Sequence, residues 1–244
     1  MRKILFISIL LLGCNQFFEE NAPLPGNYYI EDGWDAFEQK RYEKAHQLFS
    51  ASLVGGHNPF YSHAYIGLGW NCFYYANQLT GSENYDKRIE QRDFAYEYFQ
   101  LALVELEPVD SIQDSELLQN YSDYLSGMTY HWSYNVMKMS ELFYLNNNQI
   151  YWDEMLMYSD SLISVSDQLL EQTNGEYNFL YDDTFNSDDI RWLRAQTYIR
   201  LNQLDEAHAE ANNIDFLRDC LEQFTVIQCL NNCQTGTCFS NINP

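Results

Sequence analysis

A five-residue segment occurs twice in this 244-residue chain, and this internal repeat constrains the fold more than any other feature. Residues 33–37 read Gly-Trp-Asp-Ala-Phe and residues 69–73 read Gly-Trp-Asn-Cys-Phe, so small, aromatic and polar residues keep their places. Self-similarity of this kind indicates one structural unit that is used more than once. Such units bury their apolar faces by stacking on one another, so we expect a series of similar modules.

A second pattern follows each copy of the repeat. Phe49 comes four residues after Ala45, and Phe99 comes four residues after Ala95, with Ala102 three residues further on. Spacings of three and four place side chains on the same face of an α-helix. Period-two patterns long enough for a β-strand are absent from the sequence. The sequence therefore predicts an all-α fold in which each module is a helical hairpin.

The predicted hairpin resembles the tetratricopeptide repeat (TPR), in which a small residue on the first helix and an alanine on the second allow close approach. The interval between these positions is 12 residues from Gly33 to Ala45 and again 12 residues from Ala195 to Ala207. The resemblance implies a TPR-like α-solenoid of about four hairpins over residues 27–219.

The middle hairpins depart from the family pattern. The interval from Gly69 to Ala95 is 26 residues, 14 more than in the first copy, so the helices or the loop are longer there. The third hairpin keeps Gly127 as its small residue, but an apolar helical stripe replaces its alanine pattern. We expect the four hairpins at residues 27–55, 60–107, 112–172 and 187–219.

The TPR resemblance also implies a binding groove. In that family the first helices of successive hairpins line a concave face, and residues just after the small position point into it. Carried over to this chain, the groove contains Trp34, Phe37, Glu38, Trp70, Phe73, Tyr74, His131, Trp132, Gln196, Ile199 and Arg200. Aromatic side chains on such a face offer a large contact area at low entropic cost. The alternative is that many of them pack between hairpins, as helix aromatics usually do.

The N-terminus has the pattern of an export signal. Basic residues precede an apolar segment that is shorter than the roughly 20 residues of a membrane span. The segment ends in Leu-Leu-Gly before Cys14, which resembles the bacterial lipobox. The resemblance implies that residues 1–13 are removed, that Cys14 carries lipid and that residues 14–26 form a tether. The alternative is an ordinary secretory signal with a chance cysteine.

The same resemblance implies a lipid-anchored protein of the bacterial cell envelope. Asn15 stands where some lipoproteins carry the aspartate that retains them in the inner membrane, which favours the outer membrane.

The charge balance limits the possible partners. The chain has 13 basic and 35 acidic residues, a net charge of −22, and removal of two basic residues with the signal leaves −24. Such a field repels phosphate backbones, so nucleic acid is excluded as a partner. It favours a protein or peptide segment that is basic, although the charge can also serve only to keep the surface soluble.

Four cysteines, Cys220, Cys229, Cys233 and Cys238, gather in residues 220–244, a short tail after the last hairpin. In an exported protein this even number predicts two disulfides, with three pairings open. Zinc is the alternative, but intervals of eight, three and four residues lack the usual two-residue knuckle. Cys72 is expected to be a buried free thiol.

The sequence contains no motif that supports catalysis. Gly-rich phosphate loops, nucleophile elbows and paired zinc histidines are all missing, and we expect neither a metal nor a cofactor. The expected function is a non-enzymatic, membrane-anchored scaffold that binds a protein segment in its groove. The alternative is a surface glycan-binding or nutrient-uptake accessory lipoprotein, because 20 tyrosines and 5 tryptophans can form aromatic platforms.

Overall fold

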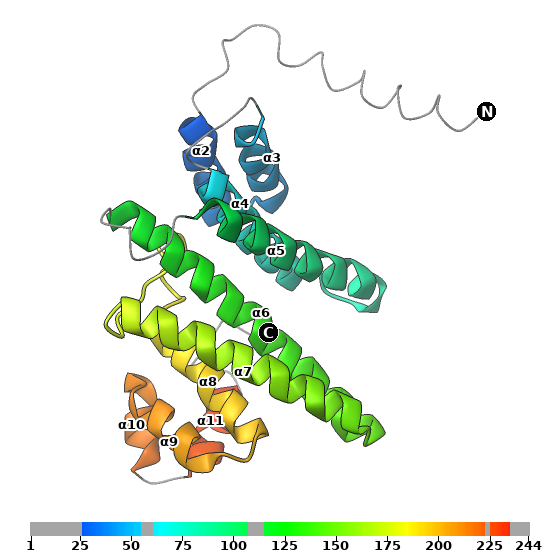
Figure 1. The fold of residues 1–244 in the computed structure, drawn as a ribbon, viewed down its shortest axis with the longest axis vertical. Coiled ribbons are helices and arrows are strands. Elements are labelled where there is room, and N and C mark those ends of the chain that lie inside the picture. Colours follow the sequence, from blue (N-terminus) through cyan, green and yellow to red (C-terminus); the bar gives the residue numbers. More distant parts are fainter. Residues whose placement is uncertain (1–25, 55–60, 107–114, 223–224, 235–244) are drawn as a thin grey trace, which may run out of the picture.

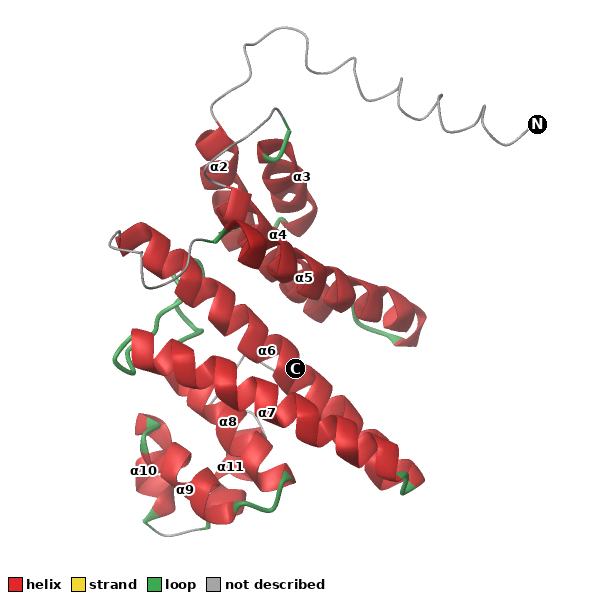
Figure 2. Ribbon diagram, viewed as in Figure 1, coloured by secondary structure: helices red, strands yellow, loops and turns green. Residues whose placement is uncertain are grey.

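The computed structural model describes residues 26–54, 61–106, 115–222 and 225–234 (Figure 1). In these ranges the α-helices are α2 (Gly26–Glu38), α3 (Tyr42–Ser52), α4 (Tyr61–Gln78), α5 (Tyr85–Glu105), α6 (Ser115–Asn146), α7 (Gln149–Gln172), α8 (Ser187–Arg200), α9 (Leu204–Asn212), α10 (Asp215–Leu221) and α11 (Val226–Gln234), with a short 3-10 helix η2 (Ser82–Asn84). The described ranges contain no β-strand, so the predicted all-α class is confirmed (Figure 2). The predicted signal segment, Cys14 and almost all of the predicted tether lie outside them.

Consecutive helices pack as pairs, α2 with α3, α4 with α5, α6 with α7 and α8 with α9. The pairs fall inside the four predicted ranges, except that α2 begins one residue earlier. The additional residues of the second pair lie in the last turn of α4, in the loop that contains η2 and in the first turns of α5. The first helices of successive pairs also touch, α2 with α4, α4 with α6 and α6 with α8, so each pair packs on the next (Figure 1).

Two phenylalanine rings pack against glycines on neighbouring helices. Phe49 of α3 and Phe99 of α5 are fully buried. A methyl group added at Gly33 on α2 or at Gly67 on α4 would lie 2.6 Å from a ring carbon of Phe49. Phe99 meets Gly69 on α4 and Gly127 on α6 in the same way. Each ring therefore contacts the first helix of its own pair and that of the next, where only glycine leaves room for it.

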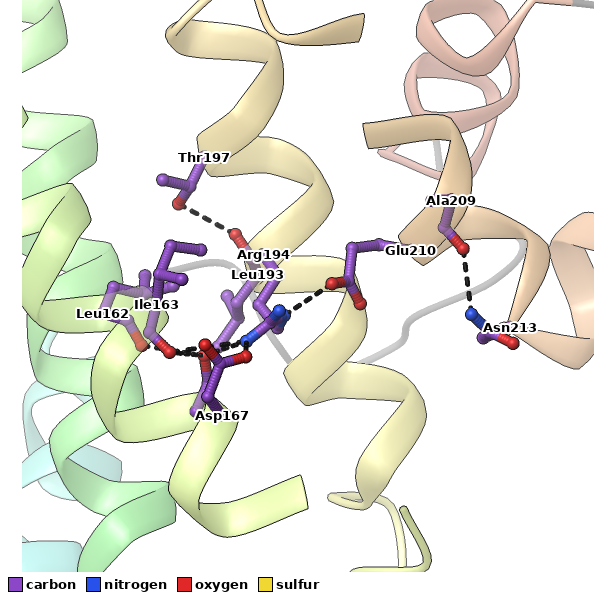
Figure 3. Close-up of polar contacts among 10 residues, drawn as sticks. Leu162, Ile163, Asp167, Leu193, Arg194, Thr197, Ala209, Glu210 and Asn213 are labelled. Carbon is purple, nitrogen blue, oxygen red and sulfur yellow. Dashed lines mark hydrogen bonds and ion pairs between the residues drawn. The ribbon is translucent and has the colours of Figure 1, made fainter. Parts of the chain in front are cut away.

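A buried cation joins α7, α8 and α9 (Figure 3). Arg194 of α8 is only 7% exposed. Its Nε donates to Glu210 Oε1 of α9 at 2.7 Å, and its Nη1 donates to Asp167 Oδ1 at 2.6 Å and to Ser166 Oγ at 2.8 Å, both on α7. Because two carboxylates surround it, the guanidinium keeps its charge in a site that is largely closed to water.

The C-terminal helices belong to the same core as the paired helices. A disulfide joins Cys220 of α10 to Cys229 of α11, and buried Val226 and Leu230 extend the main apolar cluster. Residues 226–230 are therefore a packed helical part of the fold, whereas the sequence predicted only a short tail after the last hairpin. Of the three predicted pairings, only the one that joins Cys233 to Cys238 contains this bond. The side chain of Cys233 and all of Cys238 lie outside the described part.

Cys72 on α4 is a buried free thiol, as predicted, and burial raises its pKa to about 12. Within the described ranges, none of the helices combines the length and the apolar character of a membrane span.

Candidate binding site

The face expected to form an open groove is covered by the chain's own residues 177–185, which follow α7 and are called here the covering segment. Gly175, at a φ of +79°, accepts a hydrogen bond from Arg191 Nη2 on its carbonyl oxygen at 2.9 Å, and the chain turns back there. The segment is closed at its base by Ser187 N donating to Tyr177 O at 2.8 Å. A capping box between Asn186 and Asp189 then starts α8.

Aromatic stacking holds the covering segment against α2 and α4. Phe179 stacks on Trp70 with ring centroids 4.6 Å apart, and Tyr181 stacks on Trp34 at 3.7 Å with the rings nearly parallel. Phe179 is 1% exposed, and so is Phe185, which meets Trp70 edge-on. Such contacts contribute about 0.5–1.5 kcal/mol each beyond the burial of area, so the segment is part of the core.

A buried carboxyl group on α6 anchors the start of the covering segment. The Tyr177 hydroxyl donates to Asp123 Oδ1 at 2.9 Å, and Gln119 Nε2 donates to the same oxygen at 2.8 Å. Trp70 Nε1 donates to the backbone oxygen of Asp123 at 3.0 Å. Burial raises the pKa of Asp123 to about 7, although the hydrogen bonds from Tyr177 and Gln119 act in the opposite direction.

Because the pKa of Asp123 is raised, the difference in stability between the wild type and Asp123→Asn is expected to depend on pH. Between the unfolded pKa of about 3.8 and the folded pKa of about 7, the folded state holds a proton that the unfolded state loses. The contribution of Asp123 therefore falls as pH rises through this window, by about 1.4 kcal/mol per pH unit, and is constant above it. The carboxamide of the variant resembles the protonated acid and does not titrate. We expect the deficit of the variant relative to the wild type to shrink by about 2–3 kcal/mol between pH 5 and pH 8.

Urea unfolding of both proteins at the two pH values measures this change. Asp86→Asn, at an exposed position in the first turn of α5, is the matched control and should shift stability equally at both pH values. An equal deficit of Asp123→Asn at pH 5 and pH 8 would contradict the prediction.

A pocket of about 610 Å³ remains open at the edge of the covering segment, and we call it the rim pocket. It lies between the α2–α3 turn, the C-terminal end of α4 and residues 180–184. Its walls include the aromatic side chains Phe37, Tyr42, Tyr74 and Tyr181, the carboxylates of Glu38, Asp182 and Asp183, and one cation, Lys40.

Asp182 fixes the shape of the rim pocket. Its Oδ2 accepts a hydrogen bond from Tyr74 OH at 2.6 Å, and its Oδ1 accepts from the backbone nitrogen and the hydroxyl of Thr184 at 2.9 and 2.6 Å. Burial and this bond to Asp182 both raise the pKa of Tyr74, so the phenol stays protonated. Within the part of the chain that the structure describes, Glu38 and Asp183 have no such partners, and both are exposed. Their charges are available to a ligand.

Only some of the predicted groove residues line this pocket. Phe37, Glu38 and Tyr74 do, although Phe37 is itself only 2% exposed. Trp34 and Trp70 lie beneath the covering segment, and the prediction that they face an open groove is wrong for this structure.

The other predicted groove residues lie elsewhere in the fold. Phe73 is 1% exposed and packs on the Phe99 and Tyr130 rings, so it is also closed to a ligand. Buried His131 stacks on Tyr96 at 4.4 Å, and half-buried Trp132 stacks on Tyr158 at 5.6 Å, which places both where α5, α6 and α7 meet.

On α8, Arg200 Nη1 donates to the backbone and side-chain oxygens of Gln196 at 3.0 Å, and Ile199 packs against the core. The residues predicted to line one groove therefore lie in different parts of the fold and do not form a single surface.

The covering segment and the acidic residues that it brings to the rim pocket were not predicted from the sequence. The signal that could have revealed it is the alternation of Tyr177, Phe179 and Tyr181, which is too short to predict a strand but places three rings on one edge.

The site is suited to binding through aromatic surface and negative charge. Among the described residues, no group of three histidine, cysteine, aspartate or glutamate side chains could hold a metal ion. The chain matches no protein-family model, no curated protein sequence and no solved structure.

Proposed function

We propose that the protein is a lipid-anchored, non-enzymatic binding protein of the bacterial cell envelope, and that its rim pocket holds a basic side chain of an extended protein segment. The observation that carries the proposal is the pairing of aromatic walls with the unpartnered carboxylates of Glu38 and Asp183. An arginine or lysine can lay its apolar stem against the half-buried ring of Tyr181 and direct its charge to the carboxylates.

The arrangement of the helices supports the proposal of a TPR-like solenoid. Phe49 between Gly33 and Gly67, and Phe99 between Gly69 and Gly127, repeat one contact in successive pairs. The successive contacts of α2, α4, α6 and α8 follow the same order. In such a fold the covering segment takes the place that a bound segment takes in the TPR family, which leaves the rim pocket for an external ligand.

Lipidation rests on the lipobox-like residues before Cys14. Mass spectrometry of the protein purified from membranes should identify Cys14 as an acylated N-terminal residue, and Cys14→Ala should abolish membrane retention. An unacylated N-terminus at another residue would refute the anchor without affecting the pocket.

The net charge of −22 favours a cationic partner before contact is made, because the field raises the rate of encounter at low salt. Peptide arrays that vary in arginine and lysine content can test this preference. We expect the bound peptides to be basic, and their affinity for Glu38→Gln/Asp183→Asn to be at least about tenfold lower, since a hydrogen bond to a charged group contributes about 1.5–3 kcal/mol.

The matched control is Glu97→Gln/Asp160→Asn, which removes two exposed carboxylates of α5 and α7 that do not line the rim pocket. It changes the net charge equally and should retain binding. Equal affinity of both double variants would assign binding to the overall field and refute the pocket.

Glycan binding is the second candidate, because the exposed carboxamide of Gln78 also lines the rim pocket beside its tyrosines. Amides and aromatic rings together can recognise sugars by hydrogen bonding and stacking. A glycan array on which the wild type binds and Gln78→Ala does not would favour this function over the basic segment.

A further inference from the structure

A second pocket lies next to the rim pocket and differs from it in charge. It has a volume of about 510 Å³ and lies between the start of α3 and the C-terminal end of α4. Lys40, Arg41 and Lys44 line it, with Glu43 as its single acidic residue. Three positive charges against one negative charge leave a local charge of +2 in a chain whose net charge is −22. We call it the basic pocket.

The cations of the basic pocket differ from most others in the described ranges because they have no acidic or hydrogen-bond partner there. The others interact as follows: Arg191, Arg194 and Arg218 with carboxylates; Arg88, Arg92 and Arg200 with carbonyl or amide oxygens; and Lys87 with the Tyr75 hydroxyl. Lys138 is the one other cation in these ranges whose side chain also lacks an acidic or hydrogen-bond partner.

Three unpaired cations at one pocket are unexpected in a chain with 35 acidic residues. Like charges that lie close together repel, and an anion that binds between them relieves the repulsion. Glu43 does not supply this anion fully, because its Oε1 is also the acceptor for Tyr75 OH at 3.4 Å. Lys87, which does not line the pocket, donates from Nζ to the same Tyr75 hydroxyl at 2.8 Å.

The backbone adds to this preference for an anion. Arg41 is the N-cap residue of α3, and its side chain makes no capping hydrogen bond. Residues 42–44 form the first turn of this 11-residue helix, where the helix dipole is positive. The helix dipole and the three cationic side chains therefore both favour an anion in the basic pocket.

The basic pocket and the rim pocket are continuous, because Lys40, Tyr42 and Gln78 line both of them. A ligand that occupies the rim pocket can therefore extend into the basic pocket. A protein segment that occupies the rim pocket brings carboxylates of its own, as acidic side chains and at its C-terminus, so a carboxylate is the anion that such a ligand offers to this position.

We infer that the basic pocket is a carboxylate-binding subsite that holds an acidic side chain or the C-terminal carboxylate of the segment whose basic side chain lies in the rim pocket. The identity of the ligand as a protein segment rests on the proposed function, whereas the binding of a carboxylate rests on Lys40, Arg41 and Lys44 alone. The protein would then recognise a partner segment in which a basic side chain and a carboxylate lie next to each other.

Acetate is the probe for the test, and no peptide is needed. The melting temperature of the full mature protein in neutral detergent is measured as sodium acetate replaces sodium chloride at constant ionic strength. A ligand that binds only the folded state stabilises it by RT ln(1 + [L]/Kd), so we expect a rise of about 3 °C at about 100 mM acetate. The rise should vanish in Lys40→Gln/Arg41→Gln/Lys44→Gln and persist in Lys138→Gln, which removes the one comparable cation elsewhere in the described ranges.

Three outcomes would overturn the inference. An acetate shift that is absent from the wild type, or that persists in the triple variant, would show that the three cations form no subsite. A larger shift with sulfate than with acetate, again lost in the triple variant, would replace the carboxylate by a sulfate or phosphate group. Because the acetate shift requires no basic peptide, failure of the peptide array and failure of the subsite are distinguishable.

Discussion

Phe49→Ala is expected to lower the free energy of unfolding by about 3–5 kcal/mol, the range for complete loss of a buried phenyl ring. Phe49 is fully buried between Gly33 and Gly67, and its ring meets Trp34 edge-on at 5.0 Å. Surrounding helices cannot close the space completely, because they are held by the neighbouring pairs. Urea unfolding followed by circular dichroism measures the loss, and Val54→Ala, at a residue that is 82% exposed, is the control with little expected effect.

A double-mutant cycle tests whether the glycines exist to accommodate the ring. Gly67→Ala alone should cost about 1–3 kcal/mol, because its methyl group would lie 2.6 Å from a Phe49 ring carbon. In the Phe49→Ala background the same methyl group enters space that the ring has vacated, so its cost should disappear or change sign. Additive effects of the two substitutions would contradict direct contact between ring and glycine.

This contact explains why the helix pairs could be predicted from the sequence. The positions that permit close approach, such as Gly33, Ala45 and Phe49, lie within a short stretch of chain and recur at helical spacing. Local pattern and packing agree there, so the pattern is sufficient to predict both the helices and their partners.

The site could not be predicted in the same way, because it depends on contacts between distant residues. Phe179 reaches Trp70 across 109 positions, and Asp182 reaches Tyr74 across 108. No helical period relates such residues. The TPR resemblance placed Glu38 and Tyr74 in a groove, and both line the rim pocket, but it gave no indication that residues 177–185 would cover Trp34.

The basic pocket shows a related limit of prediction. Lys40, Arg41 and Lys44 are adjacent in the sequence, but an exposed run of charge is usually a solvated surface. What distinguishes this one is that nearly every other cation in the described ranges has a partner, and that Tyr75 and Gln78 of α4 close the far side. Both facts depend on the positions of side chains on different helices, which the sequence alone does not give.

Arg194→Met is expected to cost about 3 kcal/mol, because it removes one member of a buried network and leaves the others unpaired. Glu210, whose side chain is 14% exposed, would retain a charge with no cation beside it, whereas Asp167 is 61% exposed and can turn to water. Methionine approximates the length of the arginine stem, so the loss reports the charge more than the volume. Arg218→Met is the control, because its pair with Asp215 is exposed on both sides and should contribute less than about 1 kcal/mol.

The second substitution Glu210→Leu separates charge from packing. If the cost of Arg194→Met comes from the stranded carboxylate, Arg194→Met/Glu210→Leu should recover a large part of the lost stability, since two apolar groups then meet where an ion pair stood. Guanidinium chloride unfolding of the wild type and the three variants measures the recovery. If the double variant is less stable than Arg194→Met, the network stabilises the contact of α7, α8 and α9 through its hydrogen-bond geometry, and Glu210 has a role that leucine cannot replace.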